Sequence, residues 1–255
     1  MRSIAIPSST LINETDEKIK TYKIGLIGRA AAIFRIDEIF IYRDPKLDES
    51  KFISDILRYM ETPQYLRKDL IPIKSSLKFA GVLPPLQIPS HKPKHVKIGE
   101  IREGLVKKIK PNGTALVDIG LDTYAILKST PRKKRITVKV ISKEPLIVSE
   151  AKPNDYWGYK VKITELSKIV NKNTAIITSR KCKYPDIEEL KKYSNDFILI
   201  FGSPEEGVFE IAKRIGVKIK NKPCWNLIPD QGVKTVRLEE AIFSSLAILN
   251  YISRL

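Results

Sequence analysis

An alternation of short apolar runs with a longer helical pattern, at the start of the chain, constrains the fold more than any other feature. Residues 4–6 form a short apolar run closed by Pro7, which is typical of a buried parallel strand. Residues 16–34 then carry apolar side chains at roughly helical spacing, and residues 36–42 are rich in β-branched and aromatic side chains. This order predicts a βαβ unit with parallel strands, so we expect an α/β fold class.

Two glycines interrupt the predicted first helix. Gly25 and Gly28 each cost a helix about 1 kcal/mol relative to alanine, so we expect another backbone, from a neighbouring helix or a ligand, to approach closely there. The small-residue surface that they form with Ala32 is one that a second subunit would cover, which favours a homodimer. Arg29 lies beside this surface, and a solvated arginine is its ordinary explanation.

The same alternation returns in the last third of the chain. Residues 174–178 predict a buried strand, residues 186–193 a short charged helix, and residues 197–201 the most hydrophobic strand of the chain. The loop that follows begins at Gly202. It lies beyond the carboxyl end of a strand, where ligands bind in open α/β sheets. Because glycine has no side chain, Gly202 would let a ligand approach the backbone.

Several common motifs are missing from the sequence. The Gly202 loop lacks G-x-G-x-x-G and the P-loop lysine pattern, which argues against a dinucleotide or nucleoside triphosphate site. H-E-x-x-H and a paired Cys/His set are absent, so we assign no metal, and no G-x-S-x-G elbow is present. Cys182 and Cys224 are too few and too far apart for a disulfide framework or a metal site, which favours a reduced, cytoplasmic protein. Without a run of eighteen or more apolar residues or a signal peptide, we expect no membrane.

The middle of the chain has a different character. Prolines at 84, 85, 89 and 93 mark an extended linker, at which we place a domain boundary. Short strand-like runs follow it, at residues 101–109, 114–119, 123–127, 136–140 and 159–163. Asn112-Gly113 and Gly120 supply turns. Five strands of this length predict a small closed barrel of the OB type, which is a common nucleic-acid-binding architecture.

The net charge indicates an anionic partner. The chain carries 46 Lys or Arg and 29 Asp or Glu, a formal charge of +17, and this favours nucleic acid or an acidic membrane. Residues 94–163 hold sixteen Lys or Arg and seven Asp or Glu, so they contribute +9. Their densest patch is Arg132, Lys133, Lys134 and Arg135. We favour contact of this patch with an RNA backbone over a solvated basic loop.

A second candidate RNA contact lies within residues 51–72, which predict another helical stretch. Tyr65 can stack on a base while Arg67 and Lys68 hold phosphates. The alternative is a helix C-terminus with its usual cations.

A loop running into a helix ends the chain. Pro229, Asp230 and Gly232 are turn formers. Thr235 is a candidate N-cap, and a dense apolar face follows to residue 249. Such a loop exposes backbone N–H and C=O groups that can hold a small polar ligand. A surface loop before a buried helix is the alternative.

Eight motifs, spread over both ends of the chain, resemble the SPOUT class of RNA methyltransferases. They are residues 4–7 (IAIP), 28–39 (GRAAAIFRIDEI), 62–68 (TPQYLRK), 77–86 (LKFAGVLPPL), 201–204 (FGSP), 226–232 (NLIPDQG), 235–237 (TVR) and 239–241 (EEA). Within that class, the chain is most similar to the archaeal and eukaryotic members that carry an inserted barrel.

The resemblance implies a fold and a domain arrangement. Residues 1–92 and 165–255 would form one discontinuous parallel-sheet domain whose C-terminal part is threaded into a trefoil knot. Residues 93–164 would form the OB-like barrel. The resemblance also implies a homodimer, in which subunits pair through their first and last helices.

The resemblance implies S-adenosylmethionine as the cofactor, held by the two loops of the knot. Main-chain groups of Leu227, Ile228 and Val236 would surround the adenine. The residues that would bind the cofactor are Phe201, Gly202, Ser203, Gly207, Asn226, Leu227, Ile228, Pro229, Gln231, Gly232, Thr235 and Val236.

The implied reaction is methyl transfer to RNA, with ribosomal RNA as the expected substrate. N3 of uridine is the first choice for the acceptor and a ribose 2′-hydroxyl the alternative; a non-catalytic RNA-binding or ribosome-assembly protein remains a further alternative. Either acceptor must lose a proton, so a base or a stabilising cation would help. The candidates are Arg29, Arg237, Glu239 and Glu240. Arg237 and Glu240 are also spaced as an ordinary surface ion pair.

Overall fold

Two sets of strands organise the chain. The computed structural model describes residues 1–255 and divides them into two compact units. The first unit contains residues 1–60, 74–86 and 159–255, and the second contains residues 61–73 and 87–158.

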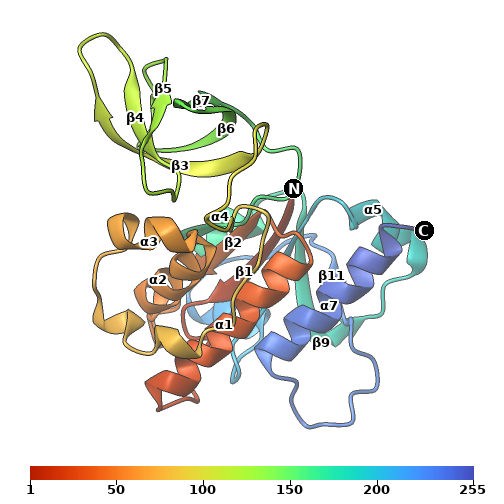
Figure 1. Ribbon diagram of the computed structural model, residues 1–255. Coiled ribbons are helices and arrows are strands. Elements are labelled where there is room, and N and C mark those ends of the chain that lie inside the picture. Colours follow the sequence, from red (N-terminus) through yellow and green to blue (C-terminus); the bar gives the residue numbers. More distant parts are fainter. The chain divides into compact units, whose positions relative to one another are not determined.

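The first unit is built on a six-stranded sheet in the order β11-β9-β10-β1-β2-β8 (Figure 1). The strands are β1 (Arg2–Pro7), β2 (Glu38–Tyr42), β8 (Lys160–Thr164), β9 (Ala175–Lys183), β10 (Phe197–Ile200) and β11 (Cys224–Trp225). All neighbours pair in parallel. The α/β class expected from the sequence is therefore confirmed.

The helices of this unit begin and end where the sequence supplies local signals. They are α1 (Glu17–Ile33), α2 (Ser50–Glu61), α4 (Leu166–Val170), α5 (Ile187–Tyr193), α6 (Val208–Arg214) and α7 (Leu238–Ile252), with short 3-10 turns η1 (Ser75–Leu77) and η2 (Ala80–Val82). Asp16 caps α1 by accepting the backbone N–H groups of Lys18 and Ile19. Asp186 caps α5 by accepting that of Glu189 at 2.7 Å.

Helices cover both faces of the sheet. On one face, alternate strand residues pack against α4 and α6: this core contains Ala5, Phe40, Tyr42, Ala175, Ile177, Ile198 and Ile200 from the strands. On the other face, α1 and α7 lie side by side (Figure 1). The rings of Phe34 and Phe243 join them edge to face, with centroids 6.3 Å apart. Both faces are buried, which explains why these strands read as continuous apolar runs.

The two glycines of α1 are approached closely by other parts of the same chain. A Cβ at Gly25 would lie 2.9 Å from Pro84 and 3.0 Å from Leu83, and one at Gly28 would lie 2.9 Å from the Tyr159 hydroxyl. A close approach is thus found, but it is made by side chains and not by another backbone as expected. The expectation that a second subunit covers this surface is wrong, because residues distant in the sequence already do.

The second unit holds a closed five-stranded barrel in the order β3-β4-β5-β7-β6 (Figure 1). Its elements are α3 (Gln64–Leu70), β3 (Ile101–Ile109), β4 (Ala115–Asp118), β5 (Ala125–Leu127), β6 (Arg135–Lys143) and β7 (Leu146–Glu150). Inward side chains such as Val117, Leu127 and Val138 fill it. Gly113 and Gly120 have φ of +82° and +80°, which confirms the predicted turns. The OB-like barrel is confirmed.

One strand prediction is wrong. Residues 159–163, expected in the barrel, lie within β8, which pairs with β2 at the edge of the parallel sheet. The fifth barrel strand is β7 instead. An edge strand exposes alternate side chains, here Lys160 and Lys162, just as a barrel strand does. Periodicity alone therefore cannot distinguish them.

Candidate functional site

A cavity of about 500 Å³ opens in the first unit at the carboxyl ends of β9 and β10, beside β11 and the start of α7. This is where parallel sheets hold ligands. Its wall contains Thr178, Ser179, Arg180 and Lys181 from β9, Phe201 to Gly207 from the loop after β10, Glu210 from α6, Trp225 to Ile228, Gln231, Thr235 and Val236 around the next loop, and Leu238, Ala241 and Ser245 from α7.

The loop after β10 is tightly folded. The backbone N–H of Ser203 donates to the Glu206 carbonyl at 2.8 Å, and the N–H of Glu206 donates to the Ser203 hydroxyl at 3.0 Å. A Cβ at Gly202 would lie 2.5 Å from the Glu206 carbonyl oxygen and 2.8 Å from Cα of Gly207. Glycine at 202 is therefore required by the return of the loop itself, whereas the sequence led us to expect a ligand as the reason.

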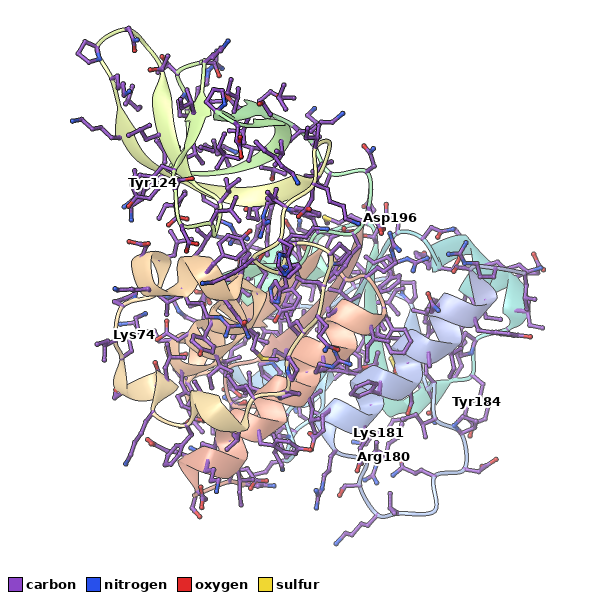
Figure 2. All side chains as sticks on the ribbon, in the orientation of Figure 1. Lys74, Tyr124, Arg180, Lys181, Tyr184 and Asp196 are labelled. Carbon is purple, nitrogen blue, oxygen red and sulfur yellow. A yellow bond between two sulfur atoms is a disulfide. The ribbon has the colours of Figure 1, made fainter.

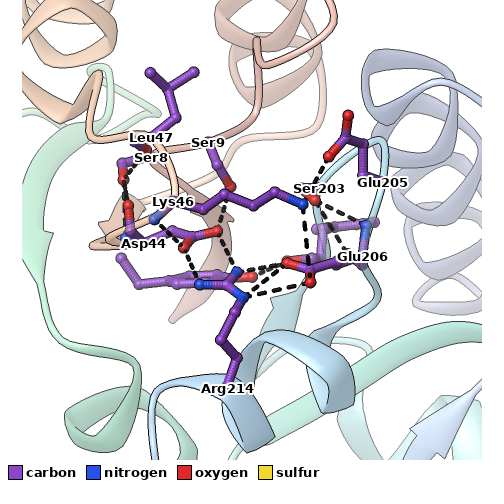
Figure 3. A network of polar contacts seen from close by, with 11 residues as sticks. Ser8, Ser9, Asp44, Lys46, Leu47, Ser203, Glu205, Glu206 and Arg214 are labelled. Atoms are coloured by element: carbon purple, nitrogen blue, oxygen red, sulfur yellow. Dashed lines mark hydrogen bonds and ion pairs between the residues drawn. The ribbon is translucent and has the colours of Figure 1, made fainter.

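A polar network anchors this loop to the strands beside it (Figure 3). The Arg214 guanidinium donates to Asp44 at 2.8 and 3.1 Å and to Glu206 at 2.5 Å. Asp44 is fully buried, and it also accepts the Ser9 hydroxyl at 2.6 Å. Burial by itself would raise the pKa of Asp44, but the hydrogen bonds from Arg214 and Ser9 outweigh it, so the pKa lies below its ordinary value. Lys46 pairs with Glu205 at 2.8 Å.

The second loop, from Asn226 to Val236, is tied to β9. The Asn226 side chain donates to the Arg180 carbonyl at 3.1 Å and accepts the N–H of Ile228 at 3.0 Å. The Arg180 guanidinium donates to the Lys234 carbonyl at 2.8 Å. Gln231 reaches the carbonyls of Val233 and Lys234 at 3.0 and 3.3 Å.

The cavity brings together most of the residues predicted to bind a cofactor. Phe201, Gly202, Ser203, Gly207, Asn226, Leu227, Ile228, Gln231, Thr235 and Val236 line it, whereas Pro229 and Gly232 do not. Sequence reasoning missed the segment from Thr178 to Lys181. The signal was available, since β9 lies next to β10 and its carboxyl end must reach the same edge of the sheet.

The candidate catalytic residues lie outside the cavity wall. Arg29 donates to the carbonyls of Pro85 and Leu86 at 3.0 and 2.9 Å. Glu240 accepts the backbone N–H of Arg237 at 2.9 Å, which places this pair at the start of α7. Arg237 is the N-cap position, so the prediction that Thr235 caps the helix is wrong. The Glu240 carboxylate supplies the cap from within the first turn, and Thr235 stays in the cavity wall.

The two cysteines form a disulfide, which corrects the expectation drawn from their distance in the sequence. Cys182 directly follows the cavity segment of β9, and Cys224 belongs to β11, which pairs with β9. Their Cα atoms lie 5.5 Å apart although 42 positions separate them. The pairing of their strands brings the two cysteines together, and the number of residues between them does not reveal this pairing.

In the second unit, the candidate RNA-binding residues divide into two groups. Arg132, Lys133 and Lys134 are exposed, whereas Arg135 pairs with Glu61 at 2.8 Å and with Glu103 at 2.6 Å. These carboxylates raise the pKa of Arg135 above its ordinary value despite its burial. Arg135 therefore stabilises the unit internally, and three exposed cations remain.

The α3 candidates also have internal partners. The Tyr65 hydroxyl donates to the Glu103 carbonyl at 3.0 Å, and a Cβ at Gly120 would lie 2.4 Å from the Tyr65 ring. Arg102 lies 5.4 Å from the centroid of that ring. Arg67 donates to the Thr62 carbonyl at 3.1 Å, while Lys68 is exposed.

Two further findings concern the whole chain. No group of three or more His, Cys, Asp or Glu side chains is arranged to hold a metal ion. No helix is both long enough and apolar enough to cross a membrane.

Comparison with known proteins identifies relatives over almost the whole chain. A model of the family described as "Putative RNA methyltransferase" matches residues 1–249. An uncharacterized protein of Halobacterium salinarum is 30% identical, with 97% of this chain and 98% of that protein covered. The "28S rRNA (uridine-N(3))-methyltransferase" of Homo sapiens is 29% identical, with 97% and 77% covered. The protein of the same name in Drosophila melanogaster is 28% identical, with 97% and 61% covered.

Proposed function

The chain belongs to this family of RNA methyltransferases, and from that membership we propose that it transfers a methyl group from S-adenosylmethionine to N3 of a uridine in ribosomal RNA. The uridine and its atom are proposed from the names of the human and fly relatives. One observation supports the proposal most directly. The residues matched by the family include both loops that enclose the cavity at the carboxyl ends of β9 and β10.

The cavity has the size and lining that a nucleoside-containing methyl donor needs. A volume of about 500 Å³ lies within the range of small-molecule sites, and apolar walls with a few polar groups are typical of them. Phe201, Leu227 and Val236 supply apolar surface. Ser203, Asn226 and Gln231 supply hydrogen-bonding side chains. When bound, S-adenosylmethionine supplies an electrophilic methyl group on a sulfonium.

We propose that ten of the twelve predicted cofactor residues hold the donor: the ten that line the cavity, without Pro229 and Gly232. The backbone of Leu227, Ile228 and Val236 would bind the adenine edge, as the family resemblance implies. The protein's contribution to the rate would then be to hold the acceptor nitrogen in line with the methyl group.

We also propose that the barrel unit binds the RNA backbone, through Arg132, Lys133 and Lys134 and through Lys68 on α3. These four cations are exposed, and they belong to a region with a strong positive charge. In this scheme the first unit carries the chemistry and the second holds the substrate.

Membership of the SPOUT class, with its knot and its dimer, is part of the proposal. The resemblance of the sequence motifs at both ends of the chain supports it. Exposed apolar side chains support a dimer through the first and last helices: Ile19, Tyr22 and Ile33 on α1 and Tyr251 on α7 are each about half exposed or more. Light scattering at micromolar concentration should report a dimer, and a monomer in the presence of cofactor would refute this part.

The test of the activity is incubation of unmodified large-subunit rRNA transcripts with the protein and isotopically labelled S-adenosylmethionine. Nucleosides are then identified by mass spectrometry, and we expect labelled N3-methyluridine. Labelled 2′-O-methyl nucleosides would favour the ribose alternative. No label, together with no cofactor binding by calorimetry, would favour a non-catalytic RNA-binding protein.

A further inference from the structure

The cavity contains one charged side chain that no opposite charge compensates. Five charged residues line it: Arg180, Lys181, Glu205, Glu206 and Glu210. Lys181 pairs with Glu210 at 2.7 Å, Glu205 with Lys46 at 2.8 Å, and Glu206 with Arg214 at 2.5 Å. Arg180 forms no ion pair, and its guanidinium donates only to a backbone carbonyl.

Arg180 is exposed to solvent and also keeps unused hydrogen-bonding capacity. One Nη1 N–H donates to the Lys234 carbonyl at 2.8 Å, which ties the guanidinium to the loop that precedes α7. The remaining N–H groups of the fork have no partner. Arg180 and Lys181 lie together beside the loop that precedes α7 (Figure 2).

Each carboxylate of the cavity is engaged by a cation. The hydrogen bond from Lys181 lowers the pKa of Glu210 below its ordinary value. Glu205 and Glu206 are held by Lys46 and Arg214. No histidine lines the cavity. If the acceptor reacts as an anion here, the cavity offers a cation that can stabilise this anion but no free base that can take its proton.

We propose that Arg180 is a catalytic residue that stabilises the deprotonated imide of the target uridine. This inference rests on the proposed function. Loss of the N3 proton spreads negative charge over N3 and the two flanking carbonyl oxygens, and a guanidinium fork can donate two hydrogen bonds to such an edge.

The step balances without a further reactant. The N3 proton leaves to solvent, and the N3 electron pair forms the bond to the methyl carbon. The carbon–sulfur bond breaks, and its electron pair stays on sulfur as a neutral thioether. Arg180 keeps its proton throughout.

The experiment compares Arg180→Gln with Arg180→Lys, using two transcripts of large-subunit rRNA. One contains uridine and the other 5-fluorouridine, whose N3 proton is more acidic. Single-turnover rates of N3 methylation are measured from about pH 7 to about pH 9, where ionisation of the imide limits the rate. Calorimetry with S-adenosylhomocysteine and thermal unfolding are measured for every variant.

We expect Arg180→Gln to slow methylation of the uridine transcript about 100- to 1,000-fold near neutral pH, the loss that follows removal of one donor to a developing anion. The deficit should shrink at higher pH and with the 5-fluorouridine transcript. Arg180→Lys should retain part of the rate, because it keeps a cation. S-adenosylhomocysteine affinity should change less than about threefold, which is under 0.7 kcal/mol.

Two controls separate this role from a structural one. Gln231→Ala removes a second hydrogen bond to the Lys234 carbonyl without changing the net charge. It should weaken cofactor binding and leave the pH profile of the methylation rate unaltered. Lys183→Gln removes a cation from the same strand but outside the cavity, where Lys183 pairs with Glu189, and should leave the rate unchanged.

The outcomes are distinct. Wild-type rates in Arg180→Gln would overturn the inference, as would a deficit that is equal for both transcripts and at every pH. Formation of 2′-O-methyl nucleosides by the wild type would overturn it as well. A wild-type protein that neither binds the cofactor nor methylates RNA would refute the proposed function itself.

Discussion

Gly202, in the cavity wall, and Gly232, outside it, differ in what surrounds them. A Cβ at Gly202 would collide with the backbone of Glu206 and Gly207, whereas no atom lies within 4 Å of the position that a Cβ would take at Gly232. Both residues have backbone angles that other residues can adopt, since neither has a positive φ. Their substitution therefore tests steric fit alone.

The first prediction compares alanine at these two positions. Gly202→Ala must displace the loop that forms one wall of the cavity, so we expect its affinity for S-adenosylhomocysteine to fall at least about tenfold, or about 1.4 kcal/mol. Gly232→Ala should bind like the wild type and unfold at the same temperature or slightly higher. Calorimetry measures both. Equal affinities in the two variants would contradict the assigned role of the Gly202 loop.

At the scale of elements, the Asp44 network connects loops that follow three different strands. Ser9 follows β1, Asp44 follows β2 and Glu206 follows β10, while Arg214 ends α6. The pair between the buried Asp44 and the partly exposed Arg214 therefore links these loops and helps to give the cavity wall one conformation.

The second prediction concerns Asp44→Asn. Because the folded-state pKa of Asp44 is lowered, its carboxylate contributes stability above its unfolded-state pKa of about 3.9 and loses that contribution as the pH falls through the folded value. At neutral pH the variant should have a lower free energy of unfolding than the wild type. Removing one partner of a buried ion pair costs roughly 3–5 kcal/mol. We expect a loss at the lower end of this range, because Arg214 still pairs with Glu206. The gap from wild type should close below about pH 4.

Urea unfolding at several pH values measures this difference. Lys46→Gln is the matched control, because Lys46 and Glu205 form an exposed pair beside the network, and little change is expected. A gap between Asp44→Asn and wild type that does not depend on pH would show that the effect comes from packing and not from the carboxylate charge.

At the scale of the whole molecule, the cations of the basic patch at residues 132–135 differ in whether they form ion pairs within the protein. Arg135 is engaged by Glu61 and Glu103, while its three neighbours Arg132, Lys133 and Lys134 are exposed. A basic patch that looks uniform in the sequence therefore divides into one structural residue and three that are available for a phosphate backbone.

The third prediction follows from that division. Replacing Arg132, Lys133 and Lys134 by glutamine should weaken binding to many RNAs alike. It should also make the salt dependence of the binding constant shallower, by about 0.7–0.9 in the log–log slope for each phosphate that the protein no longer neutralises. Cofactor affinity should not change. Arg135→Gln should instead lower the unfolding temperature and keep the slope. Fluorescence titrations of one RNA at several salt concentrations decide the matter, and an unchanged slope in the triple variant would contradict RNA binding by this patch.

Apolar periodicity in the sequence located most strands and helices, because this signal is local, but it missed β7 and α6. Asp16 and Asp186 begin helices as expected, and the glycine-containing loops after β10 and β11 were recognised from composition and resemblance. The sequence also determined the fold class and the charge of the middle region.

Which segments contact one another became clear from the tertiary structure. Edge strand β8 and barrel strand β7 have similar alternation, and only hydrogen-bond pairing assigns each to its sheet. Strand pairing likewise joins Cys182 to Cys224. Arg135 forms ion pairs with carboxylates from distant parts of the chain, whereas no carboxylate reaches Arg180. Neither outcome can be read from the neighbouring residues in the sequence. Periodicity reports the environment of a side chain but not the identity of its partner, which is fixed by contacts between residues far apart in the sequence.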